Sequence, residues 1–178
     1  MTLMKQKYKN IIAKSNILFV FALCLLLTSC GIYSFTGASI PPGAKTLSIG
    51  YFNNRAPTVQ PTLSSVFTDK LKDYFTSQSN LDLVDGEADV EISGYIVNYN
   101  VAPASLQSND QVALDRLTIT IQVKCVNKLE PKFNFSQNFS RYKDYDARVS
   151  LMSVESGLIE EISTELVEDI YQKAFVNW

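Results

Sequence analysis

Histidine is absent from the 178-residue sequence. Without imidazole the chain has no Ser-His-Asp or Cys-His catalytic group, no histidine metal ligand and not the commonest general base. It also lacks a glycine-rich phosphate loop and the paired-cysteine spacing of a zinc site. Asp144 and Asp146 could approach a metal, but two carboxylates in a loop are more typical of a solvated turn. The sequence therefore predicts a protein that is not an enzyme and that has no cofactor or metal.

Cysteine is scarce, and the three cysteines have different surroundings. Cys24 lies inside an apolar run near the amino terminus, and Cys30 ends that segment. Cys125 alternates in phase with the apolar residues of a predicted strand, which favours a small buried hydrophobic side chain without reactivity. The alternative is a reactive thiol or one that pairs between chains.

No apolar run is long enough to cross a bilayer, which takes about 20 residues. The run Ile17–Leu27 has eleven residues and follows a segment with four lysines and no acidic residue. This pattern is typical of a secretory signal peptide. The next residues, Leu27-Thr28-Ser29-Cys30, match the bacterial lipobox, which predicts cleavage before Cys30 and acylation of its thiol. Two or three acyl chains anchor a protein stably where one does not. The alternative is a plain signal peptide with an accidental cysteine.

These features divide the chain into a signal peptide (1–29), a lipidated tether (30–44) rich in Gly, Ser and Pro, and a single α+β domain (45–178). Cleavage leaves 149 residues, the size of one domain. Removing the four lysines of the leader from the 16 Lys and Arg leaves 12, against 18 Asp and Glu. So acidic a body argues against nucleic-acid binding, which needs a basic stripe.

Hydrophobic periodicity predicts four strands, at 45–52, 89–101, 115–127 and 133–142, and two helices, at 62–78 and 153–175. In the first strand Leu47, Ile49 and Tyr51 are expected to share one face. Residues 53–57 are expected to form a loop, and 81–84 only a short extended piece. A phase change in the second strand predicts either a β-bulge near Gly94 to Val97 or a strand that is covered on both faces. The order favours a two-layer α+β fold, with two helices on one face of a four-stranded, mostly antiparallel sheet.

The phase opposite to the apolar one in the last two strands is polar and nearly uncharged. Its ten residues are Arg116, Thr118, Thr120, Gln122, Lys124, Asn134, Ser136, Asn138, Ser140 and Tyr142. Only two of the ten carry a charge, whereas solvated faces usually mix Lys and Glu. Such a surface suits a polar wall, for example the lumen of an outer-membrane barrel. The alternative is that Thr and Ser are simply good strand residues facing water.

Two further charge patterns bear on binding. The acidic residues of the last helix (Glu155, Glu160, Glu161, Glu165, Glu168 and Asp169) are more typical of a solvated face than of a docking site. The basic residues Arg55, Arg116, Lys124, Arg141, Lys143 and Arg148 could cluster and meet the phosphorylated head of a glycolipid. The alternative is that these six are ordinary surface cations.

Four segments together resemble one family. They are CGIYSFTGASIPPGAKTLSI (30–49), YFNNRAPTVQPTLS (51–64), DRLTITIQVKC (115–125) and LIEEISTELVEDIYQKAFVNW (158–178). They resemble the lipopolysaccharide-assembly lipoproteins, LptE, in a divergent branch, over essentially the whole mature chain. The resemblance implies two helices on one face of a four-stranded sheet. It also implies an outer-membrane lipoprotein that plugs the LptD barrel, assists its assembly and helps to deliver lipopolysaccharide to the outer leaflet.

The resemblance does not transfer individual contact residues, because the family's basic residues cannot be aligned here one by one. The candidate contacts with lipopolysaccharide or the partner therefore rest on the sheet argument: Arg116, Lys124, Thr118, Thr120, Gln122, Asn138 and Arg55. One alternative function is a lipid-anchored docking module of another envelope secretion or transport complex. Another is an envelope hydrolase, whose turnover would depend on a single serine or carboxylate.

Overall fold

The computed structural model describes residues 40, 42–105 and 113–176. The predicted signal peptide, the lipidation site Cys30 and nearly all of the tether lie outside these residues, so they stay predictions. The same holds for residues 106–112 and for the last two residues, 177–178.

The centre of the sheet is an antiparallel meander of three long strands. They are β4 (Val90–Ser105), β5 (Leu114–Asn127) and β6 (Phe135–Asp146), with a short 3-10 turn, η1 (Pro131–Phe133), before β6. The predicted meander is confirmed, and each strand extends beyond its expected bounds at one end or both. The buried Asn127 closes the β5–β6 connection, because its side-chain oxygen accepts the N–H groups of Leu129 and Glu130.

The prediction of a four-stranded, mostly antiparallel sheet is wrong, because the sheet has six strands and is mixed. β1 (Thr46–Ile49) lies parallel to both β3 (Asp82–Leu83) and β4, and β2 (Asn53–Asn54) lies parallel to β4. β2 and β3 have two residues each, too few to show a period of two. The chain returns through a helix between β2 and β3, and such a crossover joins parallel strands.

Asp89, the residue before β4, holds the start of β1. Its Oδ2 atom accepts the backbone N–H groups of Lys45 and Thr46 at 2.9 and 3.0 Å, and also the Thr46 hydroxyl. The Asp89 N–H donates back to the Thr46 hydroxyl oxygen at 2.9 Å. These contacts favour the charged carboxylate and lower the pKa of Asp89, the backbone hydrogen bond from Lys45 having the largest effect.

The first strand ends earlier than expected, at Ile49, and the phase of the side chains then reverses. Leu47 and Ile49 are buried as predicted, but Tyr51 is 55% exposed and Phe52 is fully buried. Tyr51 was therefore placed on the wrong face. The reversal follows from Gly50 and Tyr51, which lie outside the strand and separate β1 from β2.

The predicted bulge in β4 is confirmed. The register with β5 shifts between Ile96 and Asn98, so Val97 is the extra residue. Beyond it Tyr99 pairs with Ile119 and returns to the buried face. At Gly94 a Cβ atom would lie 2.0 Å from the carbonyl oxygen of Gln122 and 2.5 Å from the Phe52 ring. Only glycine fits there.

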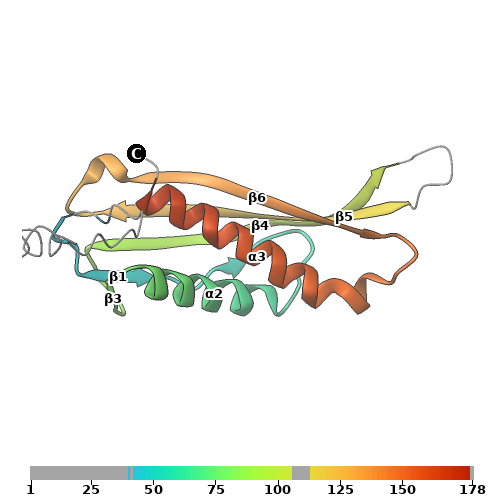
Figure 1. Ribbon diagram of the computed structural model, residues 1–178, viewed down its shortest axis with the longest axis horizontal. Helices are drawn as coiled ribbons and strands as arrows, with labels where there is room; N and C mark the ends of the chain where they lie inside the picture. Colours follow the sequence, from blue (N-terminus) through green and yellow to red (C-terminus); the bar gives the residue numbers. More distant parts are fainter. Residues whose placement is uncertain (1–39, 41, 106–112, 177–178) are drawn as a thin grey trace, which may run out of the picture. The chain divides into compact units, whose positions relative to one another are not determined.

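Both helices, α2 (Leu63–Gln78) and α3 (Leu151–Phe175), cover the same face of the sheet (Figure 1). They begin and end close to the predicted residues. Their ends pack through aromatic rings, with Phe75 and Phe175 at 5.0 and 5.3 Å from the Tyr171 ring centre. The Tyr171 hydroxyl also donates to the Gln78 carbonyl at 2.6 Å. Within the part of the chain described, no helix combines the length and hydropathy needed to span a membrane.

The acidic run of α3 is only partly the solvated face that was predicted. Asp169 pairs with Arg141 of β6 at 2.6 Å, and Glu165 pairs with Lys143 of β6 at 2.7 Å. Glu160 pairs with Lys70 of α2. Because these pairs are largely exposed to water, each contributes little to stability. They orient α3 over β6 and over α2.

Candidate functional site

The face of the sheet that the helices leave uncovered is called here the open face. The register places five pairs of β5 and β6 residues on it: Arg116–Asp144, Thr118–Tyr142, Thr120–Ser140, Gln122–Asn138 and Lys124–Ser136. The prediction that these residues share one face is confirmed. Asn134 is the exception, because it lies before β6 and its side chain accepts the Asn127 N–H at 2.6 Å.

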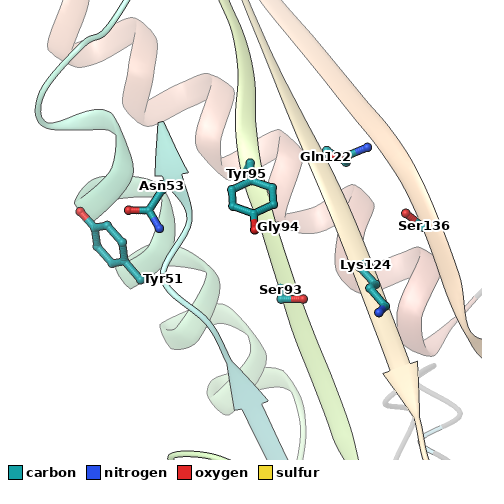
Figure 2. A pocket seen from close by; sticks show the side chains of 8 residues that line it. All are labelled: Tyr51, Asn53, Ser93, Gly94, Tyr95, Gln122, Lys124 and Ser136. Atoms are coloured by element: carbon teal, nitrogen blue, oxygen red, sulfur yellow. The ribbon is translucent and has the colours of Figure 1, made fainter. Parts of the chain in front are cut away.

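A hollow of about 430 Å³ opens on this face at its β2–β4 side (Figure 2). Residues of four strands and of the β1–β2 connection line it. They are polar or aromatic side chains and the backbone of one glycine: Tyr51, Asn53, Ser93, Gly94, Tyr95, Gln122, Lys124 and Ser136. Tyr51 reaches the hollow because of the phase reversal after Ile49, and β2 brings Asn53 beside Tyr95. The hollow thus depends on the short parallel strand that the sequence did not reveal.

Two basic side chains belong to this hollow or border it. Lys124 lines it and, among the residues described, forms no ion pair. The guanidinium of Arg55 lies 3.3 Å from the centre of the Tyr95 ring, a cation–π contact that leaves its charge without a carboxylate partner in the described residues. The structure therefore brings two of the six predicted basic residues to one place.

The other four basic residues are paired with carboxylates. Arg116 donates two hydrogen bonds to Asp144, at 2.7 and 2.9 Å, and lies 3.7 Å from the Tyr142 ring centre. The Arg116 hydrogen bond lowers the pKa of Asp144. Arg148 pairs with Asp146 in the same way and lowers its pKa to about 2. Arg141 and Lys143 pair with α3. The six do not form one basic cluster.

The remaining predicted contacts lie on the open face outside the hollow. Thr120 exchanges a hydrogen bond of 2.9 Å with Ser140, and Thr118 and Asn138 lie beside it in the register. Sequence analysis missed Tyr51, Asn53, Ser93 and Tyr95. The polar phase of the β4 segment would have identified Ser93 and Tyr95, because they alternate with Ile92 and Ile96.

The candidate metal ligands and the candidate reactive thiol of the sequence are held in other contacts. Among the described residues no group of three Cys, Asp or Glu side chains could hold a metal ion. Asp144 and Asp146, which were considered as metal ligands, are each bound by an arginine. Cys125 is 3% exposed, as predicted, and its burial raises the pKa of the thiol to about 12. The open face offers neutral hydrogen-bond donors and acceptors together with the cations Lys124 and Arg55. These groups are suited to contact a polar ligand or partner that carries some negative charge.

The model of the LptE family, described as lipopolysaccharide-assembly, matches residues 44–174. The chain belongs to the LptE family. Family membership places it in lipopolysaccharide assembly, and the family is one of assembly lipoproteins rather than of enzymes. No curated protein matches the sequence.

Solved structures are similar to this chain at low sequence identity. A hypothetical protein from Chlamydia trachomatis is 8% identical with a TM-score of 0.53, over 75% of this chain and 99% of that one. Uncharacterized lipoprotein B from Nitrosomonas europaea is 11% identical with a TM-score of 0.50, over 72% of this chain and 81% of that one. Rare lipoprotein B from Shewanella oneidensis is 16% identical with a TM-score of 0.48, over 72% and 92%. The first two support the α+β fold.

Proposed function

We propose that this LptE-family protein is a lipid-anchored outer-membrane lipoprotein that forms the plug and assembly partner of an LptD-type barrel. In that place it helps lipopolysaccharide to reach the outer leaflet. Cys30 carries the anchor, and the domain enters the barrel or faces the periplasm. The observation that supports the proposal best is the open face, which is large, polar and nearly free of unpaired charge.

Such a face matches the chemistry of a barrel lumen. The lumen of an outer-membrane barrel is lined by polar side chains. Thr118, Thr120 and Asn138 can exchange hydrogen bonds with such a wall. Removing neutral polar groups from water costs much less than removing charges. A face rich in unpaired lysine and glutamate would resist the same contact.

We also propose the hollow as the contact for a phosphorylated glycolipid head. Lys124 supplies an unpaired ammonium, and Arg55 supplies a guanidinium at its border. Asn53 and Gln122 offer amide groups that suit sugar hydroxyls. Arg116 is less suited, since Asp144 already takes two of its hydrogen bonds.

The partner is tested by photocrosslinking in the native bacterium. A photoreactive amino acid replaces Asn138 on the open face or, as the control, the exposed Thr76 of α2 on the helix side. We expect detergent extracts to contain a crosslink from position 138 to a protein of LptD size, and a weaker one or none from position 76. Extraction of an inner-membrane transporter instead would support the alternative docking module and contradict the proposal.

The glycolipid contact is tested with purified lipopolysaccharide. We expect Lys124→Glu to weaken binding roughly tenfold or more, because it replaces a charge-assisted contact with repulsion. Lys173→Glu is the control, because it makes the same change of charge on α3, which covers the opposite face of the sheet. This variant should bind lipopolysaccharide as the unaltered protein does. Equal binding by the two variants would remove Lys124 from the contact.

The anchor is tested by mass spectrometry of the mature chain extracted from membranes. We expect an acylated Cys30 as the first residue. An unmodified amino terminus, or release of the protein by osmotic shock, would contradict the lipoprotein assignment.

A further inference from the structure

The two edges of the sheet differ in length. One edge ends in β3, which has two residues. The other edge is β6, which has twelve residues and pairs with β5 along its whole length without a register shift. At about 3.3 Å per residue, β6 presents an edge of roughly 40 Å.

The backbone groups of the β6 edge can be assigned from one hydrogen bond. Ala147, just after β6, donates its N–H to the carbonyl oxygen of Ala113 at 3.0 Å. In an antiparallel ladder such bonded pairs alternate with unbonded ones. Odd-numbered residues of β6 therefore direct their N–H and C=O groups to β5, and even-numbered residues direct theirs away from the sheet. A second hydrogen bond agrees with this assignment. Lys128, just after β5, donates its N–H to the Asp89 oxygen beside β4, so even-numbered residues of β5 bond β4 and odd-numbered ones bond β6.

The outward N–H groups have no acceptor within the described part of the chain. They belong to the even-numbered residues Ser136, Asn138, Ser140, Tyr142, Asp144 and Asp146. Proteins usually protect a long edge with proline, a bulge or inward-pointing charges. β6 contains no proline and no bulge, and its inward charges, Arg141 and Lys143, are already neutralised by α3. The edge is therefore open to a further strand.

We propose that β6 is a docking edge that takes an extended segment of a partner protein as an additional strand. The inference goes beyond the proposed function and does not require the partner to be the LptD-type barrel. On the open-face side the added strand would lie beside Asn138 and Ser140, which favours Ser, Thr, Asn or Gln at those positions. On the helix side it would meet Phe139 and then the carboxylates of α3, which favours an apolar residue followed by Lys or Arg.

The charge of α3 argues for a partner protein rather than a second copy of the chain. Two copies paired antiparallel about Ser140 would place Phe139 of each opposite Arg141 of the other. They would also bring two α3 helices side by side, each with six acidic residues and one lysine: Glu155, Glu160, Glu161, Glu165, Glu168, Asp169 and Lys173. A segment with its own basic residues complements this surface, and a second α3 does not.

The test is residue-resolved hydrogen exchange on two samples of the full chain. One is the complex that co-purifies with the tagged protein from its own membranes, and the other is the purified chain alone. In the chain alone the even-numbered amides of β6 should exchange fast and the odd-numbered ones slowly. In the complex we expect the even-numbered amides from Ser136 to Asp144 to slow at least tenfold, which removes the alternation.

Two substitutions at one position give a matched test. Ser140→Pro removes an N–H that faces away from the sheet, a position where proline is tolerated in an edge strand. Ser140→Ala removes the hydroxyl and keeps the N–H. We expect the proline variant to keep the thermal midpoint within a few degrees and to lose most of the co-purified partner, while the alanine variant keeps it. If the proline variant does not fold, hydrogen exchange at the even-numbered β6 amides of the unaltered complex is sufficient to test the proposal.

Three results would overturn the proposal. One is a complex whose even-numbered amides exchange as fast as those of the chain alone. Another is slow exchange in the purified chain that depends on concentration, which would identify a second copy as the occupant. The last is slow exchange in a monomer, which would mean that the chain covers its own edge. A complex that contains the barrel without slowing these amides would contradict the edge and leave the proposed function intact.

Discussion

The two faces of the sheet place opposite demands on the same strands. On β5, Leu117, Ile119 and Ile121 are fully buried beneath the helices, and Thr118 and Thr120 alternate with them on the open face. One phase of the strand supplies the apolar core, and the other supplies neutral hydrogen-bonding groups. On this sheet the apolar core and the polar surface are therefore separated by the alternation of each strand, and not by position along the chain.

Gly94 is the position of β4 where we expect a substitution to have the largest effect, because neither face leaves room for a side chain there. We expect Gly94→Ala to lose more than about 3 kcal/mol of unfolding free energy, because its Cβ would meet the backbone oxygen of Gln122 rather than a flexible side chain. Urea unfolding measures the loss. Gly157→Ala, in α3 and with no atom within 4 Å of the added Cβ, should be as stable or gain about 0.5–1 kcal/mol. Similar midpoints for the two variants would refute this reading of Gly94.

Neighbouring residues of β5 give the direct test of the two faces. We expect Ile119→Ala to lose roughly 3 kcal/mol, since it leaves a cavity in the core. Thr118→Ala should change stability by less than about 0.5 kcal/mol, because its side chain lies on the open face. Urea midpoints at constant m-value check both. A large loss from Thr118→Ala would mean that the open face also holds the fold together.

Asp89, just before β4, shows that a polar side chain can also contribute to stability, because it binds the start of β1. Its pKa is lowered in the folded state, so its contribution is complete above the unfolded value of about 4 and is lost as pH falls through the folded pKa. We expect Asp89→Ala to be less stable than the unaltered protein at about pH 6. That gap should narrow toward about pH 2.5, as measured by thermal unfolding.

The control for Asp89 is Asp85→Ala, which changes an exposed carboxylate in the turn after β3. The described residues give Asp85 no hydrogen bond or ion pair. Its stability should follow that of the unaltered protein across the same pH range. If the difference in stability between Asp89→Ala and the unaltered protein stays constant with pH, the hydrogen bonds of Asp89 stabilise the fold equally in its charged and neutral forms. That result would contradict the prediction.

The regular parts of the fold could be predicted because periodicity is a local signal. Leu117 to Cys125 alternate over nine residues, so both their strand and its buried face follow from the sequence. The bulge at Val97 also left a visible phase change. β2 and β3 left none, since two residues define no period, and the parallel pairing of β1 joins residues more than 40 positions apart.

The site was predictable in composition but not in geometry. Lys124 and Gln122 were identified because they lie on a regular strand. The pairing of Arg116 with Asp144 could not be foreseen, because it needs the register of β5 and β6. The acidic residues of α3 look solvated in sequence for the same reason, since Arg141 and Lys143 reach them only when β6 lies under the helix.

The single extra residue at Val97 has a consequence for how β4 tolerates changes of length. On β5 the partners of Ile96 and Asn98 are the neighbours Ile121 and Thr120, so Val97 has no partner of its own in the ladder. Loss of Val97 would therefore remove the bulge and leave Asn98 on the open face and Tyr99 in the apolar layer, with its hydrogen bond to Glu155. A deletion of three nucleotides at this codon would shorten the strand without exchanging inside for outside.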